Sequence, residues 1–481
     1  MPKQVILGAH FPGVNNTTVW SDPRSGSHIE FESFRRFAQA AERGRFDFLF
    51  LAEGLALREQ RGHIHDLDVV GRPDTLPVLA ALAGVTEHLG LVGTINATFN
   101  EPYELARQFA TLDLLSQGRA GWNVVTSSDA FTGANFRRGG YLPREQRYAR
   151  AQSQVTANRH LWDSWGQDAV VADREAGRFT DGPAGEFAYA SEFFDIHGTF
   201  NTPRPPQGHP VIFQAGDSED GREFAARTAD AIFTGHGSGD DGRAFYRDIK
   251  RRLACYGRRP EDLKILPAAT FIVGGTDDEA HRISDEVRRQ QVSGQTALLI
   301  LERIWNRDLR DYDPDGPLPD IEPETQPGTL IQGRVQHVKD PAAEVARLRE
   351  LARDKNLSLR EVAIEISARQ NFVGSPETIA DALIDAVETG VSDGYILVPH
   401  ITPGGLDDFV DQVVPILTER GALRSEYAEG STLRDHLALG AARPATDWEA
   451  GSAAGQADLS GHESASHDLP SHDLTEQKES A

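Results

Sequence analysis

Polar side chains that could bind a ligand stand where apolar, strand-like runs of this sequence end. In RAGWNVVTSSD (119–129), strand alternation places Asn123 and Ser127 on one face and Trp122 on the other. Polar groups that face the inside of a sheet need hydrogen-bond partners. The run therefore fits either a strand that ends in a polar turn or the floor of a site for a heterocyclic ligand.

A second signal is QAGDSEDGREFAAR (214–227), where a strand-like run passes through small residues into a helical pattern. Ser218 stands at the position of an N-cap, which is ordinary helix stabilisation. A helix N-terminus after a strand is also an anion site, and Gly216 lets the backbone approach a phosphate. Three residues that open another helical pattern could add charge and a hydroxyl group: Arg144, Arg147 and Tyr148.

The segment GSGDDG (237–242) matches a dinucleotide-binding fingerprint, with acidic residues about 20 positions further on. Asp240 and Asp241 would place two carboxylates where a pyrophosphate has to approach. The segment also follows the sixth strand-like run and does not open a nucleotide-binding half. We therefore expect no dinucleotide site here.

HIHD (63–66) has the H-x-H spacing of a metal site, but it lies in a loop well past the end of its strand. Three other histidines, His10, His236 and His400, do follow strand-like runs. A metal-dependent hydrolase thus stays open as an alternative, although we expect no metal.

The elements that must position these residues alternate along the chain. Runs that are apolar on both faces, separated by helical patterns, are typical of a parallel sheet, and eight of them favour a closed (β/α)₈ TIM barrel of the α/β class. The predicted strands are Val5–Ala9, Phe46–Leu51, Leu89–Ile95, Arg119–Thr126, Pro210–Ala215, Asp230–Gly235, Leu266–Gly274 and Gly394–His400. Helical patterns follow at Ile29–Arg43, Asp74–His88, Glu101–Ser116, Arg144–Trp165, Ser218–Ala229, Gly242–Tyr256 and Asp277–Gln290.

Three insertions enlarge the predicted barrel domain, 1–440, at about 53–72, 166–209 and 292–371. The first follows a strand, where barrels build their active sites, so we expect it to act as a lid. In the second, AYASEFFDIHGTF is typical of a hairpin. The tail 441–481 is rich in Ala, Ser, Gly and acidic residues, repeats SHDL, and is expected to be disordered.

Composition limits the partners. The 481 residues carry a formal charge of −24, which disfavours nucleic acid and anionic lipid. No apolar run approaches the roughly 18 residues of a membrane helix. The single cysteine, Cys255, and a start without signal-peptide character favour the cytoplasm.

Taken together, these segments resemble the flavin-dependent monooxygenases of the bacterial luciferase superfamily. Within that superfamily they are similar to the group of nitrilotriacetate, dibenzothiophene sulfone and pristinamycin-forming oxygenases. The resemblance rests on LGLVGTINATFNEPYELARQFATLDLLSQGRAGWNVVTS, REQRYARA and PVIFQAGDSEDGREFAARTADAIFTGH, and extends to about Gly440 through FVGSPETIADAL and DDFVDQVVPILTERGALRSEY.

The resemblance implies a TIM barrel that binds reduced FMN from a separate NAD(P)H:flavin reductase. Oxygen would add to the flavin as a 4a-hydroperoxide, which oxygenates a small organic substrate. A homodimer or homotetramer is expected. A deazaflavin-dependent oxidoreductase of the same superfamily and a non-catalytic carrier stay open as alternatives.

By resemblance, four motif positions contact the flavin: Glu53, Thr94, Tyr148 and Ser218. Three positions depart from the family pattern. Glu53 stands where Asp is usual, Arg144 where His is usual, and Asp217 where a small residue often precedes the serine. We expect Asp217 to face away from the phosphate.

Together with the residues argued above, the predicted cofactor site is Glu53, Thr94, Asn123, Arg144, Arg147, Tyr148, Gly216 and Ser218. Catalytic residues are not assigned, because the cofactor carries the chemistry. The substrate-side candidates are His10, Trp20, His63 and Ser128. Together with Arg58 and Arg72, His10, Trp20 and His63 suit a carboxylated substrate better than a plain alkane.

Overall fold

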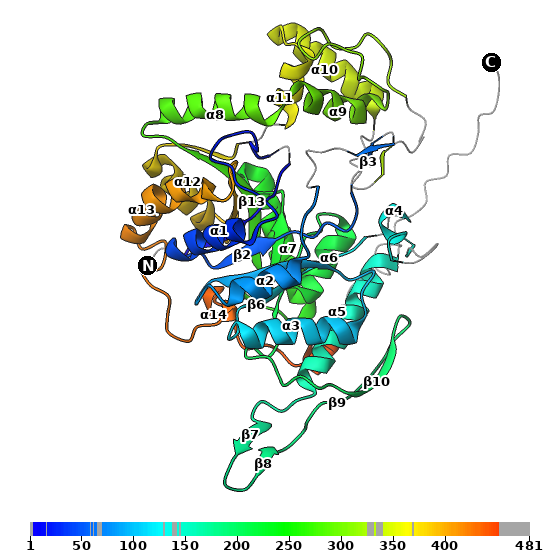
Figure 1. Ribbon diagram of the computed structural model, residues 1–481, viewed down its shortest axis with the longest axis vertical. Helices are drawn as coiled ribbons and strands as arrows, with labels where there is room; N and C mark the ends of the chain where they lie inside the picture. The colour runs from blue at the N-terminus through cyan, green and yellow to red at the C-terminus, as the bar shows by residue number, and fades with distance from the viewer. Residues whose placement is uncertain are drawn as a thin grey trace, which may run out of the picture.

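The computed structural model describes most of the chain as a barrel with additions at both ends (Figure 1). The residues it describes are 3–15, 17–57, 59–60, 62–64, 70–127, 130–136, 142–143, 146–324, 331–332, 340–367 and 370–451. Within these ranges, no helix has the length and apolar character needed to cross a membrane.

Eight parallel strands form the closed barrel that the sequence predicts. They are β1 (Ile6–His10), β2 (Phe48–Leu51), β5 (Gly90–Asn96), β6 (Ala120–Val125), β11 (Val211–Gln214), β12 (Ala231–Thr234), β13 (Lys264–Val273) and β16 (Gly394–Val398). Their order is β12-β11-β6-β5-β2-β1-β16-β13, and pairing of β12 with β13 closes the ring. A short strand, β15 (Phe372–Gly374), extends the far end of β13.

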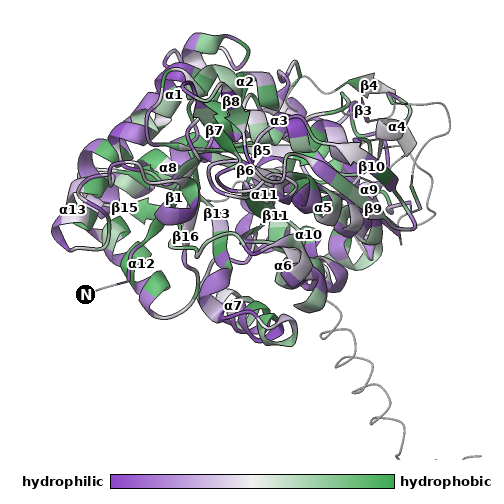
Figure 2. Cartoon of the chain, turned by 90° about the horizontal axis from the view of Figure 1, so that it is seen from below, coloured by the Kyte–Doolittle hydropathy of each residue, from purple (hydrophilic) through white to green (hydrophobic). Residues whose placement is uncertain are grey.

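Helices that follow the strands cover the barrel, and each of the seven predicted helical segments contains a helix, although the one predicted over Asp74–His88 ends at Ala83. The helices are α1 (Phe31–Arg43), α2 (Thr75–Ala83), α3 (Pro102–Leu115), α5 (Arg147–Asp163), α6 (Glu219–Thr228), α7 (Gly239–Leu253), α8 (Asp277–Gln291), α12 (Pro376–Glu388) and α13 (Val414–Glu419). Surface helices such as α7 carry hydrophilic and hydrophobic residues side by side (Figure 2). This pattern lets one side of each helix pack on the strands.

The C-terminal part of the chain closes the end of the barrel where the strands begin. Leu433 on the short helix α14 (Leu433–His436) and Leu437 belong to the apolar cluster inside the barrel. Leu433 packs against Gly90 and Gly121, where a Cβ atom would overlap its side chain. The opposite end, where the strands finish, remains available for a site.

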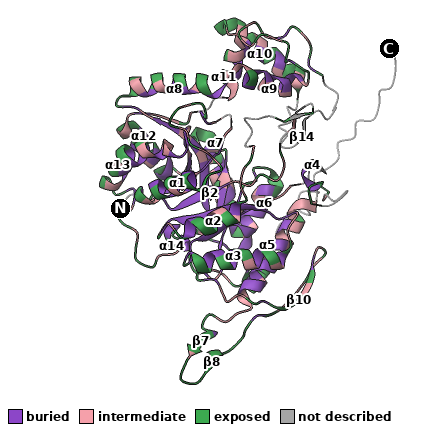
Figure 3. Ribbon diagram, viewed as in Figure 1, coloured by how far each residue is buried: buried purple, intermediate pink, exposed green. Residues whose placement is uncertain are grey.

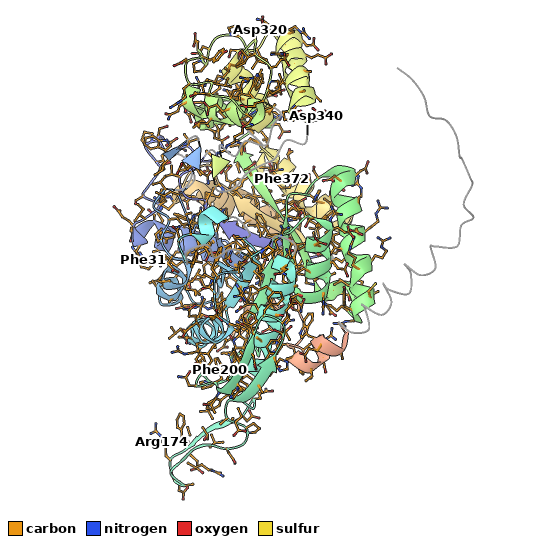
Figure 4. The ribbon with its side chains drawn as sticks, turned by 90° about the vertical axis from the view of Figure 1, so that its right-hand side faces the viewer. Phe31, Arg174, Phe200, Asp320, Asp340 and Phe372 are labelled. Carbon is orange, nitrogen blue, oxygen red and sulfur yellow. The ribbon has the colours of Figure 1, made fainter. Side chains whose placement is uncertain are left out.

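The insertion at 166–209 forms an arm that projects from the barrel. Its strands are β7 (Val170–Asp173), β8 (Arg178–Thr180), β9 (Glu186–Ala190) and β10 (Asp195–Thr199), and antiparallel pairing of β9 with β10 confirms the predicted hairpin. Most of the arm is exposed (Figure 3). Phe200 lies at its base and Arg174 near its tip (Figure 4).

The insertion at 292–371 folds as a helical cluster beyond α8 (Figure 1). It contains α9 (Gly294–Trp305), α10 (Pro341–Lys355) and α11 (Leu359–Ser367), which share a core around Trp305. Its strand β14 (Ile331–Gln332) pairs with β3 (Glu59–Gln60) of the first insertion, and β3 pairs with β4 (His63–Ile64). The two insertions are therefore joined by main-chain hydrogen bonds.

Residues 441–451 pack against the barrel, so the boundary that composition placed at residue 440 lies inside the folded chain. The indole of Trp448 is 8% exposed and lies over the guanidinium group of Arg159 at 3.8 Å. The main-chain N–H of Ala445 donates to Asp163 at 2.7 Å. The rest of the predicted tail, 452–481, lies outside the described residues.

Candidate functional site

Aromatic side chains fill the barrel below its C-terminal opening. The rings of Phe50 and Phe233 stack with centroids 5.3 Å apart and an interplanar angle of 11°. The ring of Phe213 packs edge-on against Phe50 with centroids 6.4 Å apart, and the His10 ring packs edge-on against Phe50 with centroids 5.7 Å apart. These rings give the opening an apolar floor.

The polar pair Thr94 and Asn123 lies on adjacent strands of the barrel. The two residues are directly opposite in the pairing of β5 with β6, and Asn123 Nδ2 donates to Thr94 Oγ1 at 2.9 Å. Asn123 is 2% exposed, and its Oδ1 atom has no hydrogen-bond partner among the described residues. Because a buried acceptor without a donor is costly, this oxygen is suited to accept an N–H from a ligand.

A compact loop follows β11 and leads into α6. Ser218 is the N-cap of α6, and its Oγ atom accepts from the N–H of Gly221 at 3.2 Å. The Tyr148 hydroxyl lies 3.5 Å from the same oxygen. A Cβ atom on Gly216 would lie 2.8 Å from the Tyr148 hydroxyl and 3.0 Å from the Cα of Gly221. Three predicted site residues thus meet at one helix N-terminus.

Two of the acidic side chains around this loop, Asp217 and Glu219, have partners outside it. Asp217 Oδ1 accepts from the Thr234 hydroxyl at 2.8 Å, and Glu219 pairs with Arg252 of α7 at 2.7 Å. The guanidinium group of Arg147 lies 4.7 Å from the centre of the Tyr148 ring. The loop thus combines the N-terminus of α6 with hydroxyl groups and a nearby cation, which suits an anion.

One residue near this loop was not among the predicted site residues. Gln214 ends β11, is 3% exposed, and has an Oε1 atom without a partner among the described residues. Its amide nitrogen lies against the position that a Cβ atom on Gly216 would occupy. The signal in the sequence was a single amide at the end of an apolar run, which by itself does not distinguish a ligand contact from a strand end.

Glu53 follows β2 and lines a cleft of about 590 Å³ between α2 and α3, together with Asp74. Burial raises the pKa of Glu53 to about 8, with a smaller contribution from the charge of Asp74 and an opposing one from a main-chain hydrogen bond with Asn96. A carboxyl group with this pKa is protonated at neutral pH and acts as a hydrogen-bond donor as well as an acceptor.

We expect Glu53→Gln to raise the free energy of unfolding, relative to the wild type, more at pH 8 than at pH 4. The difference between the two pH values should be at least about 1 kcal/mol. Between pH 4.5 and 8 the unfolded chain releases the proton while the folded chain retains it, so wild-type stability falls as pH rises. Urea unfolding at both pH values measures the difference. Glu104→Gln, in an exposed pair with Arg107, is the control and should keep the pH dependence of the wild type. Equal pH dependence of the wild type and Glu53→Gln would contradict the raised pKa of Glu53.

The structure describes the side chains of two of the four substrate-side candidates, His10 and Trp20. Burial, together with the charge of Arg72, lowers the pKa of His10 to about 4. His10 Nδ1 lies 3.0 Å from the Phe50 carbonyl oxygen, so the neutral ring donates from Nδ1 and leaves Nε2 as an acceptor. Trp20 is 56% exposed. The side chain of His63, and all of Arg58, Ser128 and Arg144, lie outside the described residues.

The two acidic residues of the alternative dinucleotide motif, Asp240 and Asp241, have partners within the protein. In 237–242, Asp241 Oδ2 accepts from His236 Nδ1 at 2.7 Å, and α7 begins at Gly239. Among the described residues, no three His, Cys, Asp or Glu side chains come together as a metal site would require. His65 and Asp66 of the H-x-H segment are outside those residues.

Comparison with known proteins agrees with this geometry. The model of the luciferase-like monooxygenase family matches residues 11–393. The chain is 38% identical to N-acetyl-S-(2-succino)cysteine monooxygenase of Bacillus subtilis, over 91% of this chain and 97% of that protein. It is 39% identical to nitrilotriacetate monooxygenase component A of Aminobacter aminovorans, over 91% and 95%.

Among solved structures, a riboflavin lyase with modified FMN and riboflavin superposes with a TM-score of 0.75, at 30% identity over 93% of this chain and 99% of that one. The closed barrel, the family match and the two related monooxygenases agree. The chain belongs to the luciferase-like monooxygenase family and is a flavin-dependent monooxygenase.

Proposed function

We propose that this protein is the oxygenase component of a two-component system. It would take reduced FMN from a separate NAD(P)H:flavin reductase and use O2 to oxygenate a small, carboxylated organic molecule in the cytoplasm, as a homodimer or homotetramer. The observation that carries the proposal is the meeting of Gly216, Ser218 and Tyr148 at the N-terminus of α6.

The described residues fit FMN. The phosphate would bind the N-terminus of α6 and the hydroxyl groups of Ser218 and Tyr148. The isoalloxazine ring would lie at the barrel opening, where the unpartnered Asn123 Oδ1 can accept an N–H from it. The related riboflavin lyase holds modified FMN in its structure, which supports this choice of flavin.

Bound reduced flavin supplies the electrons that activate O2. The protein's own residues would hold the ring, keep water from it and orient the substrate. The stacked Phe50 and Phe233 rings make the opening apolar, and neutral His10 offers an acceptor at its edge. This arrangement requires no nucleophile from the protein.

The substrate class follows from charge and from the relatives. Arg72 lies close enough to His10 to lower its pKa, so a cation stands beside the opening. The two related monooxygenases are named for nitrilotriacetate and N-acetyl-S-(2-succino)cysteine, which both carry carboxylates. Together these observations favour an organic acid with an oxidisable nitrogen or sulfur atom.

Oxygen transfer can be tested with an unrelated flavin reductase, FMN, NADH and ¹⁸O₂. A panel of aminopolycarboxylates and succinylated thioethers should include a substrate that gains one ¹⁸O atom. Omission of the reductase should abolish turnover, since we expect no NADH site. Oxidation of NADH by the purified protein alone at catalytic rates would contradict the two-component proposal.

The phosphate assignment predicts a selective loss of affinity. We expect Ser218→Ala and Tyr148→Phe each to raise the Kd for reduced FMN roughly ten- to a hundredfold, because each removes one charge-assisted hydrogen bond of about 1.5–3 kcal/mol. The Kd for reduced riboflavin, which lacks the phosphate, should hardly change. Anaerobic fluorescence titration measures both values, and equal losses for the two flavins would refute the assignment.

A further inference from the structure

A second cleft, of about 710 Å³, lies at the opposite end of the barrel from the proposed flavin site. It is bordered by the beginnings of β1, β13 and β16 and by the closing segment that carries α14. A volume of this size accommodates a small organic molecule. Nothing in the proposed oxygenase reaction uses this end of the barrel.

Lys264, the first residue of β13, faces this cleft. Leu266, two residues further on, belongs to the apolar cluster inside the barrel, so strand alternation turns Lys264 inward as well. The residue is 9% exposed. In the part of the chain that the structure describes, its ammonium group has neither a hydrogen bond nor an ion pair at contact distance.

Asp393, a carboxylate that lines the same cleft, is already satisfied. It accepts from the Tyr246 hydroxyl at 2.9 Å, from Lys250 Nζ at 2.9 Å and from the N–H of Ile265 at 2.8 Å. Lys250 therefore balances the charge of Asp393. Lys250 also donates to two main-chain carbonyl groups, which fills all three of its N–H positions.

Unlike Lys250, Lys264 donates to no carboxylate or main-chain carbonyl oxygen of the described residues. Burial lowers the pKa of its amine, and the charges of Asp393, Glu261 and Asp262 oppose that shift without contacting the amine. An anion that enters the cleft would offset the cost of burying this charge by pairing with Lys264.

The lining limits the charge and shape of that anion. Four basic and four acidic side chains line the cleft, and burial lowers the pKa of His436 to about 4, which leaves it neutral. This balance favours one negative charge over a polyanion. Apolar side chains of Ile6, Val387 and Leu437 complete the lining. We propose that the cleft binds a small organic acid whose single carboxylate pairs with Lys264 and whose apolar chain contacts these residues.

Calorimetric titration of the full-length protein with sodium hexanoate tests the proposal. We expect one hexanoate per chain, and about tenfold weaker binding of the uncharged hexanamide. Lys264→Met should weaken hexanoate binding at least about tenfold, whereas Lys264→Arg should retain it. Lys355→Met, on α10 in an exposed pair with Glu365 and not among the residues that line the cleft, is the control and should bind as the wild type does.

Thermal unfolding tests the premise separately. Lys264→Met removes an unpaired buried charge, so its Tm should equal or exceed that of the wild type. A lower Tm would show that the ammonium group is bonded within the protein and would overturn the proposal. Three binding results would also overturn the proposal: unchanged hexanoate affinity in Lys264→Met, tighter binding of inorganic phosphate than of hexanoate, or no hexanoate binding up to about 10 mM.

Discussion

Replacement of Gly216 by valine should weaken binding of reduced FMN by more than about a hundredfold. A Cβ atom there would lie 2.8 Å from the Tyr148 hydroxyl and 3.0 Å from the Cα of Gly221, and would overlap the Gln214 amide. The added side chain would therefore occupy the place through which a phosphate has to approach the helix N-terminus. Anaerobic titration with reduced FMN measures the loss.

The matched control is Gly440→Val, because a Cβ atom at Gly440 meets no atom within 4 Å. This variant should bind reduced FMN as the wild type does. A Gly216→Val protein that melts at the wild-type temperature and still binds FMN normally would show that the phosphate binds elsewhere.

Removal of residues 441–481 should destabilise the protein by about 3–5 kcal/mol, and Trp448→Ala alone should account for most of this loss. The Trp448 indole covers the guanidinium groups of Arg159, Arg258 and Arg443 at 3.8, 4.8 and 5.1 Å. Arg159 and Arg258 are buried, and burial lowers their pKa values to about 9 and about 10. Without the indole, these cations lose both packing and a cation–π partner.

Urea unfolding of two truncated proteins locates the boundary. Truncation after Gly440 should lower the free energy of unfolding, whereas truncation after Gly451 should leave it within about 0.5 kcal/mol of the wild type. Thr446→Ala, an exposed substitution in the same segment, serves as the control for Trp448→Ala. Equal stability of the wild type and the protein that ends at Gly440 would contradict the role of Trp448.

The barrel could be predicted because each strand is apolar on both faces and is followed by a helical pattern. The boundary at residue 440 could not, because the segment after it is polar in composition and contains one aromatic residue, Trp448. The one feature of the sequence that could have indicated packing beyond residue 440 was Trp448. Composition averages over a window and so conceals a single anchor that packs on distant arginines.

The candidate site was predictable where a motif combines with a strand end. Ser218, Gly216 and Tyr148 meet at the N-terminus of α6, and Thr94 pairs with Asn123, while their contact with a flavin stays a prediction. Gln214 and Lys264 were not predicted, because their importance depends on which partners they lack. That information is a property of the folded chain, and no spacing in the sequence carries it.

The identity of the cofactor is the central claim, and an anaerobic titration tests it most directly. Full-length protein is titrated with reduced FMN, reduced riboflavin and a reduced deazaflavin cofactor under the same conditions. We predict one reduced FMN per chain, weaker binding of riboflavin, and no saturable binding of the deazaflavin. Tighter binding of the deazaflavin than of reduced FMN, or no binding of reduced FMN, would contradict the account.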